Sequence, residues 1–259
     1  MGELCIENLQ KTYSVKDGWN RTKELSVFRD ISFTVRDGEF VSVIGTSGCG
    51  KSTLLSIAGG LAQPSGGRIL VDGRAISGPG LDRGIVFQEF ALFPWLTVLG
   101  NVAFGLRSKG LPRRQREEIA ARYVKLVGLS GFEHYHPNRL SGGMRQRVAL
   151  ARALAIEPAA LLMDEPFGAL DAQTREAMQN ALSDIWAKTR NTILFITHDI
   201  REAIYLSDRV MVLAGRPASV TFELEVNLPR PRSRFDPLFQ TFESQLEAAI
   251  GHKPMMAAE

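Results

Sequence analysis

The segment Gly45-Thr-Ser-Gly-Cys-Gly-Lys-Ser-Thr53 constrains this chain more than any other part of its sequence. An apolar run from Phe40 to Ile44 precedes it and predicts a buried strand, and residues 54–58 predict a helix after it. In such a strand, loop and helix, glycine N–H groups point inward around phosphate oxygens, and the positive end of the helix dipole lies behind them. The sequence therefore predicts a phosphate-binding loop on an α/β fold. A glycine-rich turn without a ligand is the weaker alternative.

Each residue of this loop has a predicted part in holding a nucleotide. Lys51 is expected to reach the β- and γ-phosphates, and Ser52 is expected to hold Mg²⁺. The other members are expected to line the nucleotide: Gly45, Thr46, Ser47, Gly48, Cys49, Gly50 and Thr53.

A nucleotide site of this kind needs an acid on a neighbouring strand to anchor the metal. Asp164 and Glu165 follow the apolar run 159–163, and Asp164 is the predicted Mg²⁺ partner. Glu165 lies at the carboxyl end of the predicted strand, where it can polarise the water that attacks the γ-phosphate, so it is the predicted general base. Alone, an acidic pair after an apolar run is more typical of a solvated strand end.

A second glycine-rich segment, Leu140-Ser-Gly-Gly-Met-Arg-Gln-Arg147, opens a predicted helix that ends before Pro158. Ser141 is a favourable N-cap residue, and Gly142 and Gly143 permit close approach to the backbone. The helix is thereby aimed at an anion. Without the phosphate loop upstream, an ordinary capped helix with a basic face would be the default interpretation.

In combination these segments resemble the ATP-binding cassette (ABC) ATPases, from residue 4 to about residue 232. The resemblance implies a P-loop NTPase cassette with a RecA-like parallel sheet core, an N-terminal antiparallel β subdomain and an inserted α-helical subdomain. The expected boundaries are 1–230 for the ATPase domain, about 90–158 for the helical subdomain and 231–259 for a short C-terminal extension. In this family the signature, here 140–144, faces the phosphate loop of a second subunit. The resemblance therefore implies a head-to-tail homodimer around two ATP molecules, with Mg²⁺.

The resemblance also assigns roles to four further positions. Tyr13 corresponds to the aromatic side chain that stacks on adenine, although packing is an alternative. Gln88 corresponds to the glutamine that senses Mg²⁺ and water. Asp171 corresponds to the inter-subunit aspartate, and His198 to the histidine of the γ-phosphate. Gln88 and His198 each follow an apolar run, so both are expected at carboxyl ends of strands, where ligands bind in α/β folds.

The segment 90–101 is richer in aromatic and apolar residues than a solvated loop requires. In the cassette family this region forms a groove that receives a short helix of a membrane permease, which implies integral membrane permease subunits as partners. Phe93 and Leu96 are expected to be buried, with Pro94 and Trp95 nearer the partner. Packing under the helical subdomain is the alternative for the segment as a whole.

Within the family, the closest resemblance is to the ATPase subunits of nitrate, sulfonate and taurine importers. It implies an importer subunit with an indirect solute-binding protein partner and a small anion or organic acid as solute. The chain departs from the family pattern at Thr46, where proline is common, and in a long polar segment, 16–25, which is expected to be a surface loop. The segments that carry the resemblance are Leu92–Thr97, Met163–Arg175, Thr197–Ile200, Gly215–Pro217 and Leu228–Arg232.

Composition agrees with this interpretation. A net charge of +3 is mild, so no nucleic-acid partner is expected. Two cysteines are too few for a disulfide framework and are consistent with a reducing compartment. No signal core and no apolar run of about 18 residues is present, so the chain is expected at the cytoplasmic face of the inner membrane, held there by a partner.

Two other classes of protein use the same phosphate loop. A soluble cassette ATPase of DNA repair, translation or cofactor assembly is the alternative, although the chain has neither a long coiled-coil insertion nor tandem cassettes. A small-molecule kinase or GTPase leaves the signature unexplained, and no N-K-x-D guanine motif occurs. An exporter subunit also remains open.

The remaining pattern predicts the order of elements. Residues 4–44 alternate as strands, with a hairpin turn at Asp37-Gly38. Residues 66–87 predict two short strands, and helices dominate from about 95 to 157. A helix over 172–188, a strand, a helix and a strand ending near Leu213 complete a parallel α/β pattern.

Overall fold

The computed structural model describes residues 2–17 and 21–251. Ten strands lie in these residues: β1 (Leu4–Asp17), β2 (Arg21–Val35), β3 (Phe40–Gly45), β4 (Gly66–Val71), β5 (Arg74–Ala75), β6 (Arg83–Val86), β7 (Ala160–Asp164), β8 (Thr192–Ile196), β9 (Arg209–Gly215) and β10 (Ala218–Glu225). The helices are α1 (Lys51–Ala58), α2 (Val98–Ala103), α3 (Arg113–Leu126), α4 (Gly142–Ala155), α5 (Ala172–Thr189), α6 (Ile200–Leu206), α7 (Pro237–Gly251) and the short 3-10 helices η1 (Gly105–Lys109) and η2 (Pro137–Arg139).

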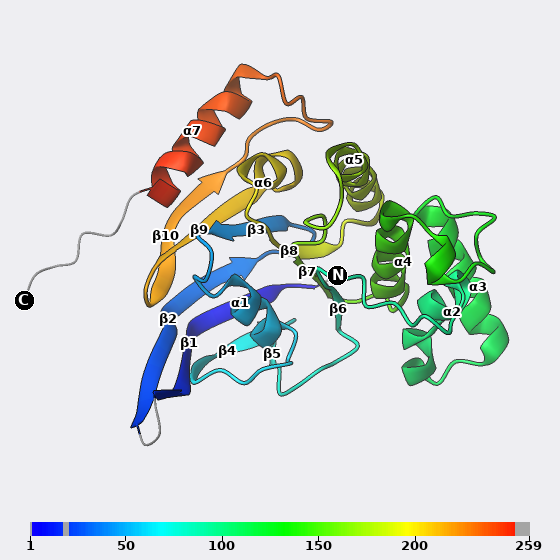
Figure 1. Ribbon diagram of the computed structural model, residues 1–259, viewed down its shortest axis with the longest axis horizontal. Coiled ribbons are helices and arrows are strands. Elements are labelled where there is room, and N and C mark those ends of the chain that lie inside the picture. The colour runs from blue at the N-terminus through cyan, green and yellow to red at the C-terminus, as the bar shows by residue number, and fades with distance from the viewer. Residues whose placement is uncertain (1, 18–20, 252–259) are drawn as a thin grey trace, which may run out of the picture.

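The strands form one sheet with the order β5-β4-β1-β2-β10-β9-β3-β8-β7-β6 (Figure 1). From β9 to β6 the neighbouring strands are parallel. Around β1 the pairs with β2 and β4 are antiparallel, as is the pair of β4 and β5. A parallel contact of β10 with β2 joins the two halves. The predicted mixed α/β sheet is therefore confirmed.

Strand β3 shows how the sheet is covered on both faces. All six of its residues are buried, and successive side chains point to opposite faces of the sheet. Phe40 and Ile44 pack in one core with residues of α5 and α6. Val41 and Val43 pack in a second core with residues of α1. A strand buried on both faces is a near-continuous apolar run, which is the pattern that the sequence has here.

The expected surface loop over 16–25 is wrong at both of its ends. β1 continues to Asp17 and β2 begins at Arg21, with Tyr13 opposite Leu25 and Ser14 opposite Glu24. Both faces of a projecting two-stranded ribbon meet solvent, so its polar residues carry no apolar alternation that would mark a strand. Residues 18–20 lie outside the part of the chain that the structure describes.

The turn at Asp37-Gly38 exists, but the hairpin predicted around it does not. Gly38 has a φ of +71°, and Glu39 N–H donates to the Arg36 carbonyl oxygen at 3.0 Å. Strands β2 and β3 on either side are not partners, because β10 and β9 lie between them in the sheet. Turn residues specify a local reversal and not the strand that pairs next. Similarly, the segment 66–87 holds three strands rather than two, with β5 and β6 at opposite edges of the sheet.

Helices α2, α3 and α4 pack together beside the sheet (Figure 1). Their buried residues, among them Val102, Val124 and Val148, belong to the same core as α5 and α6. The proposed bounds of the helical subdomain and of the ATPase domain stay predictions.

The C-terminal segment packs against the sheet and α6. After β10, residues 226–236 run along α6, and α7 follows over β9 and β10 (Figure 1). Phe239 and Leu246 of α7 are fully buried. Of the predicted extension 231–259, residues 252–259 lie outside the described part of the chain.

Candidate active site

The phosphate-binding loop lies between β3 and α1, as predicted. Gly48 and Gly50 have φ values of +76° and +97°, in the left-handed region that glycine adopts at no steric cost. At Gly50 an added Cβ would lie 2.5 Å from Cγ1 of Val27, so a side chain has no room there. Cys49 is buried beneath the loop, which leaves its backbone as the part that can meet a ligand.

Lys51 is the first residue of α1 and its side chain lies within the loop. Its Nζ donates hydrogen bonds to the carbonyl oxygens of Gly45 (2.8 Å) and Thr46 (3.2 Å). The ammonium group is thus held against the backbone of the loop at the N-terminus of α1, which is a favourable environment for a phosphate.

A cavity of about 510 Å³ opens over this loop, and we call it the P-loop cavity. Tyr13 of β1 forms part of its wall, and Leu25 and Val27 of β2 lie beside it. These three side chains supply an aromatic and apolar wall of the kind that a nucleotide base can pack against. The other lining residues are Ser47, Gly48, Gly50, Lys51, Ser52, Thr53, Glu165 and His198.

Leu25 and Val27 were not predicted. Their only signal is the register that places Leu25 opposite Tyr13. Leu25 falls in the segment 16–25 that was predicted to be a loop, and the strand pattern predicted for the rest of 4–44 does not specify this pairing.

Ser52 and Asp164 meet at the edge of the cavity. The Ser52 hydroxyl donates to Oδ1 of Asp164 at 3.2 Å, which brings together oxygens of α1 and β7. Burial raises the pKa of Asp164, and the hydrogen bond from Ser52 opposes this rise. A hydroxyl and a carboxylate are the hard oxygen donors that Mg²⁺ prefers, so these residues fit the metal.

Glu165 and His198 lie on adjacent strand ends and contact each other. Asp164 pairs with Ile196 in the parallel register of β7 and β8. Glu165 and His198, which follow within two residues, therefore leave the two strands at the same edge of the sheet. Nδ1 of His198 lies 2.9 Å from Oε2 of Glu165. Glu165 has a φ of +41°, a conformation that costs a non-glycine residue about 1 kcal/mol or more and that occurs preferentially at functional sites.

Gln88 lies outside the P-loop cavity. It is exposed beyond β6 and lines a separate hollow with Phe90 and Arg145. Its side chain still lies close to Glu165, because Nε2 of Gln88 and Oε2 of Glu165 are 3.6 Å and 3.9 Å from the point that a Cβ added to Gly168 would occupy.

The signature residues also lie away from the P-loop cavity. Ser141 caps α4 by accepting a hydrogen bond from Met144 N–H at 3.3 Å. An added Cβ at Gly143 would lie 2.7 Å from Cγ2 of Thr174, so this glycine permits the close packing of α4 on α5. Asp171 caps α5 by accepting from Thr174 N–H at 3.0 Å. Neither Asp171 nor any of Ser141, Gly142 and Gly143 lines the P-loop cavity.

The aromatic segment after Gln88 is held by one buried amide. Asn101 accepts from Phe93 N–H and donates to the carbonyl oxygens of Phe93, Leu96 and Thr97. Phe93 and Leu96 are half-buried rather than buried, because the segment lies at the surface. Trp95 is 69% exposed, and Pro94 is exposed beside it. Asn101 was missed, since an asparagine inside an apolar run gives no signal of its own.

Together the fold and the site define a P-loop nucleotide hydrolase. The ABC transporter family model matches residues 28–168, and this chain belongs to that family. It is an ATPase with the cassette fold, as predicted, and ATP is its nucleotide.

Three relatives with functional names are import ATP-binding proteins. The nitrate import ATP-binding protein NrtD of Synechocystis sp. is 52% identical over 226 residues, which cover 87% of this chain and 83% of that protein. The taurine import ATP-binding protein TauB of Burkholderia pseudomallei is 45% identical over 238 residues, which cover 92% of this chain and 90% of that protein. The aliphatic sulfonates import ATP-binding protein SsuB of Bacillus licheniformis is 49% identical over 222 residues, which cover 85% of this chain and 86% of that protein. The predicted resemblance to this group is confirmed.

A solved structure agrees with the fold. It is the dimeric post-hydrolysis state of an ATP-binding cassette bound to ADP and Pi, which matches with a TM-score of 0.74 and 33% identity over 86% of this chain and 99% of that chain. Within the described residues of the present chain, no helix has both the length and the apolar composition needed to cross a membrane.

Proposed function

We propose that this chain is the ATP-hydrolysing subunit of an ABC importer and that it works as a head-to-tail homodimer around two ATP molecules. One observation carries the proposal. The P-loop cavity is lined by one set of predicted residues, while the signature, exposed at Ser141, lies elsewhere on the same chain. A second copy placed head to tail brings its Ser141 and Gly143 to the open side of this cavity, and the reverse contact completes the second site.

Within each site, the roles follow from the positions of the residues. Lys51 and the backbone of 45–53 bind the phosphates, and Tyr13 stacks on adenine. Ser52 and Asp164 would hold Mg²⁺, which supplies charge neutralisation of the phosphates when bound. Gln88, whose Nε2 lies near the Glu165 carboxylate, completes this set. Asp171 of each copy contacts the other copy near the shared site.

Hydrolysis is assigned to Glu165 with His198. Glu165 accepts a proton from a water molecule whose oxygen bonds to the γ-phosphorus, and the bond from phosphorus to the β,γ-bridging oxygen breaks. The products are ADP and inorganic phosphate. His198 contacts Glu165 and orients the γ-phosphate beside it. Release of the products weakens the dimer, because the γ-phosphate that joined the two copies has left the site.

The dimer drives a membrane permease at the cytoplasmic face of the cell membrane. The exposed Pro94 and Trp95, on a segment fixed by Asn101, supply the surface that receives a helix of the permease. By analogy with the named relatives, the solute is a small anion or organic acid such as nitrate, a sulfonate or taurine. A solute-binding protein delivers it to the permease, and the solute does not contact this chain.

Glu165→Gln tests the assignment of the general base. The variant should bind ATP normally and lose activity by roughly 10²- to 10⁴-fold, the usual range for such a group. The matched control is Glu118→Gln, the same change at an exposed glutamate of α3, which should keep full activity. The measurement is phosphate release at saturating ATP together with an ATP-binding titration. Near-normal hydrolysis by Glu165→Gln would contradict the assignment.

A further inference from the structure

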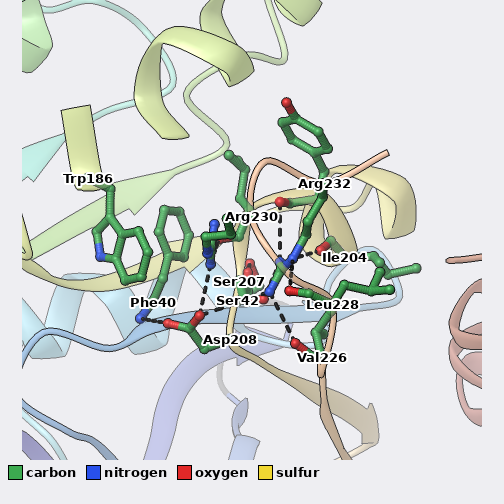
Figure 2. A network of polar contacts seen from close by, with 12 residues as sticks. Phe40, Ser42, Trp186, Ile204, Ser207, Asp208, Val226, Leu228, Arg230 and Arg232 are labelled. Carbon is green, nitrogen blue, oxygen red and sulfur yellow. Dashed lines mark hydrogen bonds and ion pairs between the residues drawn. The ribbon is translucent and has the colours of Figure 1, made fainter. Parts of the chain in front are cut away.

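The proposed catalytic roles leave unused one motif that the sequence analysis singled out, Leu228-Pro-Arg-Pro-Arg232. Figure 2 shows its two arginines at the C-terminal end of α6. Arg232 donates to the carbonyl oxygens of Ile204, Tyr205 and Ser207. Arg230 donates to the Leu206 carbonyl oxygen at 2.6 Å and to Oδ1 of Asp208 at 2.9 Å. The last carbonyl groups of a helix have no partner within the helix, so these arginines cap α6.

The other end of α6 lies at the active site. The helix begins at Ile200 with Asp199 as its N-cap, one residue after His198. Because α6 is only two turns long, whatever fixes it also fixes the backbone next to His198.

Arg234, two residues beyond the motif, connects the C-terminal segment to α5 and α6. Its Nη1 donates to Oε1 of Glu176 at 2.7 Å, and its Nη2 donates to Oε1 of Gln179 at 2.5 Å. Its guanidinium carbon lies 4.0 Å from the centre of the Tyr205 ring. The bond to the Gln179 carbonyl oxygen decides which way this amide faces, because the opposite end of the amide must then be its NH₂ group.

The NH₂ group of Gln179 contacts Glu202 of α6. Nε2 of Gln179 donates to Oε1 of Glu202 at 2.9 Å. The two side chains belong to residues that are only 6% and 5% exposed. A buried carboxyl group is costly without donors, and a reversed Gln179 amide would present an oxygen to it. The orientation that Arg234 imposes is therefore the one that Glu202 requires.

Glu202 reaches the residues on both sides of His198. Its Oε2 accepts a hydrogen bond from the Thr197 hydroxyl. The same Thr197 oxygen accepts from Asp199 N–H at 3.0 Å. One carboxyl group thus holds Thr197 and, through it, the backbone amide of Asp199. His198 lies between them, with its ring against Glu165.

We infer that Arg234 is a positioning residue for His198, acting through Gln179, Glu202 and Thr197. The inference rests on the proposed role of His198 in hydrolysis. It assigns to the segment after the last strand a part in the catalytic step: the segment sets the position of the γ-phosphate histidine from the far side of α6. Misplacement of a catalytic group by about 1 Å can cost up to 10²-fold in rate, so the effect is measurable.

The test compares Arg234→Ala with Glu176→Ala. The first variant removes the contact to Gln179, and the second removes only the ion pair of Arg234 with the exposed Glu176 side chain. Arg234→Ala should lower kcat about tenfold and change the KM for ATP less than about twofold, because the phosphate-binding loop is untouched. Glu176→Ala should keep kcat. Arg234→Lys should recover part of the loss, since its ammonium group can still donate to Gln179.

A double-mutant cycle with His198→Ala separates positioning from general stability. If Arg234 acts through His198, Arg234→Ala should change kcat less than about twofold in the His198→Ala background. A full tenfold loss in that background, or an unchanged kcat for Arg234→Ala alone, would overturn the inference. His198→Ala by itself must lower kcat, and its failure to do so would instead overturn the proposed role of His198. Urea unfolding of each variant confirms that the folded protein is being compared.

Discussion

Glu165 combines a strained backbone with a fixed partner. Its φ of +41° and its 2.9 Å contact with His198 occur at the ends of adjacent parallel strands. The backbone amide of Glu165 is also bonded, at 2.9 Å, to the Ile196 carbonyl oxygen of β8. These contacts hold the carboxylate at the mouth of the P-loop cavity, which is where a general base for water must lie.

Substitutions of Tyr13 test whether the aromatic wall of the cavity binds the adenine base. Tyr13→Ala should weaken ATP binding by about 1–2 kcal/mol, roughly tenfold, because stacking on the base is lost. Tyr13→Phe keeps the ring and should bind ATP normally. Calorimetric titration with ATP and with inorganic tripolyphosphate measures the effect, and tripolyphosphate should bind equally to all three proteins. An equal loss of affinity for both ligands would place Tyr13 outside the adenine site.

Much of the catalytic centre was predictable from single residues in sequence. The strand, loop and helix pattern predicted the position of Lys51 and Ser52, and the ends of β7 and β8 hold Asp164, Glu165 and His198 as expected, while the catalytic roles of these residues stay predictions. Leu25 and Val27 were not predictable as wall residues, because their position depends on how β1 pairs with β2, which local sequence does not specify. Gln88 follows β6, as predicted, and its Nε2 lies near Glu165 although it does not line the P-loop cavity.

At the scale of elements, α6 is the helix that begins directly after His198 and its neighbour Asp199. It is held at one end by Arg230 and Arg232 and at the other by the Glu202 contacts. The strand β3 and the end of α6 are also joined directly by the buried hydroxyl groups of Ser42 and Ser207 (Figure 2). The sequence predicted a helix before the strand that ends near Leu213, but it did not predict these long-range caps, which come from a segment more than twenty residues away.

Arg232→Met should destabilise the protein. The side chain of Arg232 is 2% exposed, and burial together with the neighbouring Arg230 lowers its pKa to about 9, so it stays charged at neutral pH. Methionine keeps the apolar stem but leaves buried carbonyl groups without donors, at a cost on the order of 3 kcal/mol. Urea unfolding gives the change in the free energy of unfolding. Arg232→Lys, with three donors, should lose less than Arg232→Met. A loss below about 1 kcal/mol for Arg232→Met would contradict the capping role.

At the scale of the whole molecule, two separate surfaces are expected to meet partners. The P-loop cavity faces a second copy of the chain, and the Pro94–Trp95 surface faces the permease. Both can exist on one chain because helices α2 to α4 lie beside the sheet (Figure 1), whereas the P-loop cavity lies over the loop that follows β3.

Trp95→Ala should uncouple the chain from its permease. Loss of an exposed aromatic anchor typically costs an interface about 2 kcal/mol or more, so recovery of a polytopic membrane protein with the tagged chain from gently solubilised membranes should fall strongly. The isolated chain should keep its ATPase activity. Phe235→Ala, at a 91% exposed phenylalanine before α7, is the control and should leave recovery unchanged. Equal recovery with Trp95→Ala and the unmodified chain would exclude this surface as the docking site.

The pairing of two chains around ATP is tested most directly by light scattering of the Glu165→Gln variant. Without nucleotide, or with ADP, the measured mass should be the 28.6 kDa of one chain. With ATP and Mg²⁺ the mass should double, and Ser141→Arg added to the same chain should abolish the doubling while ATP still binds. A variant that binds ATP fully and keeps the mass of one chain would contradict the shared-site account.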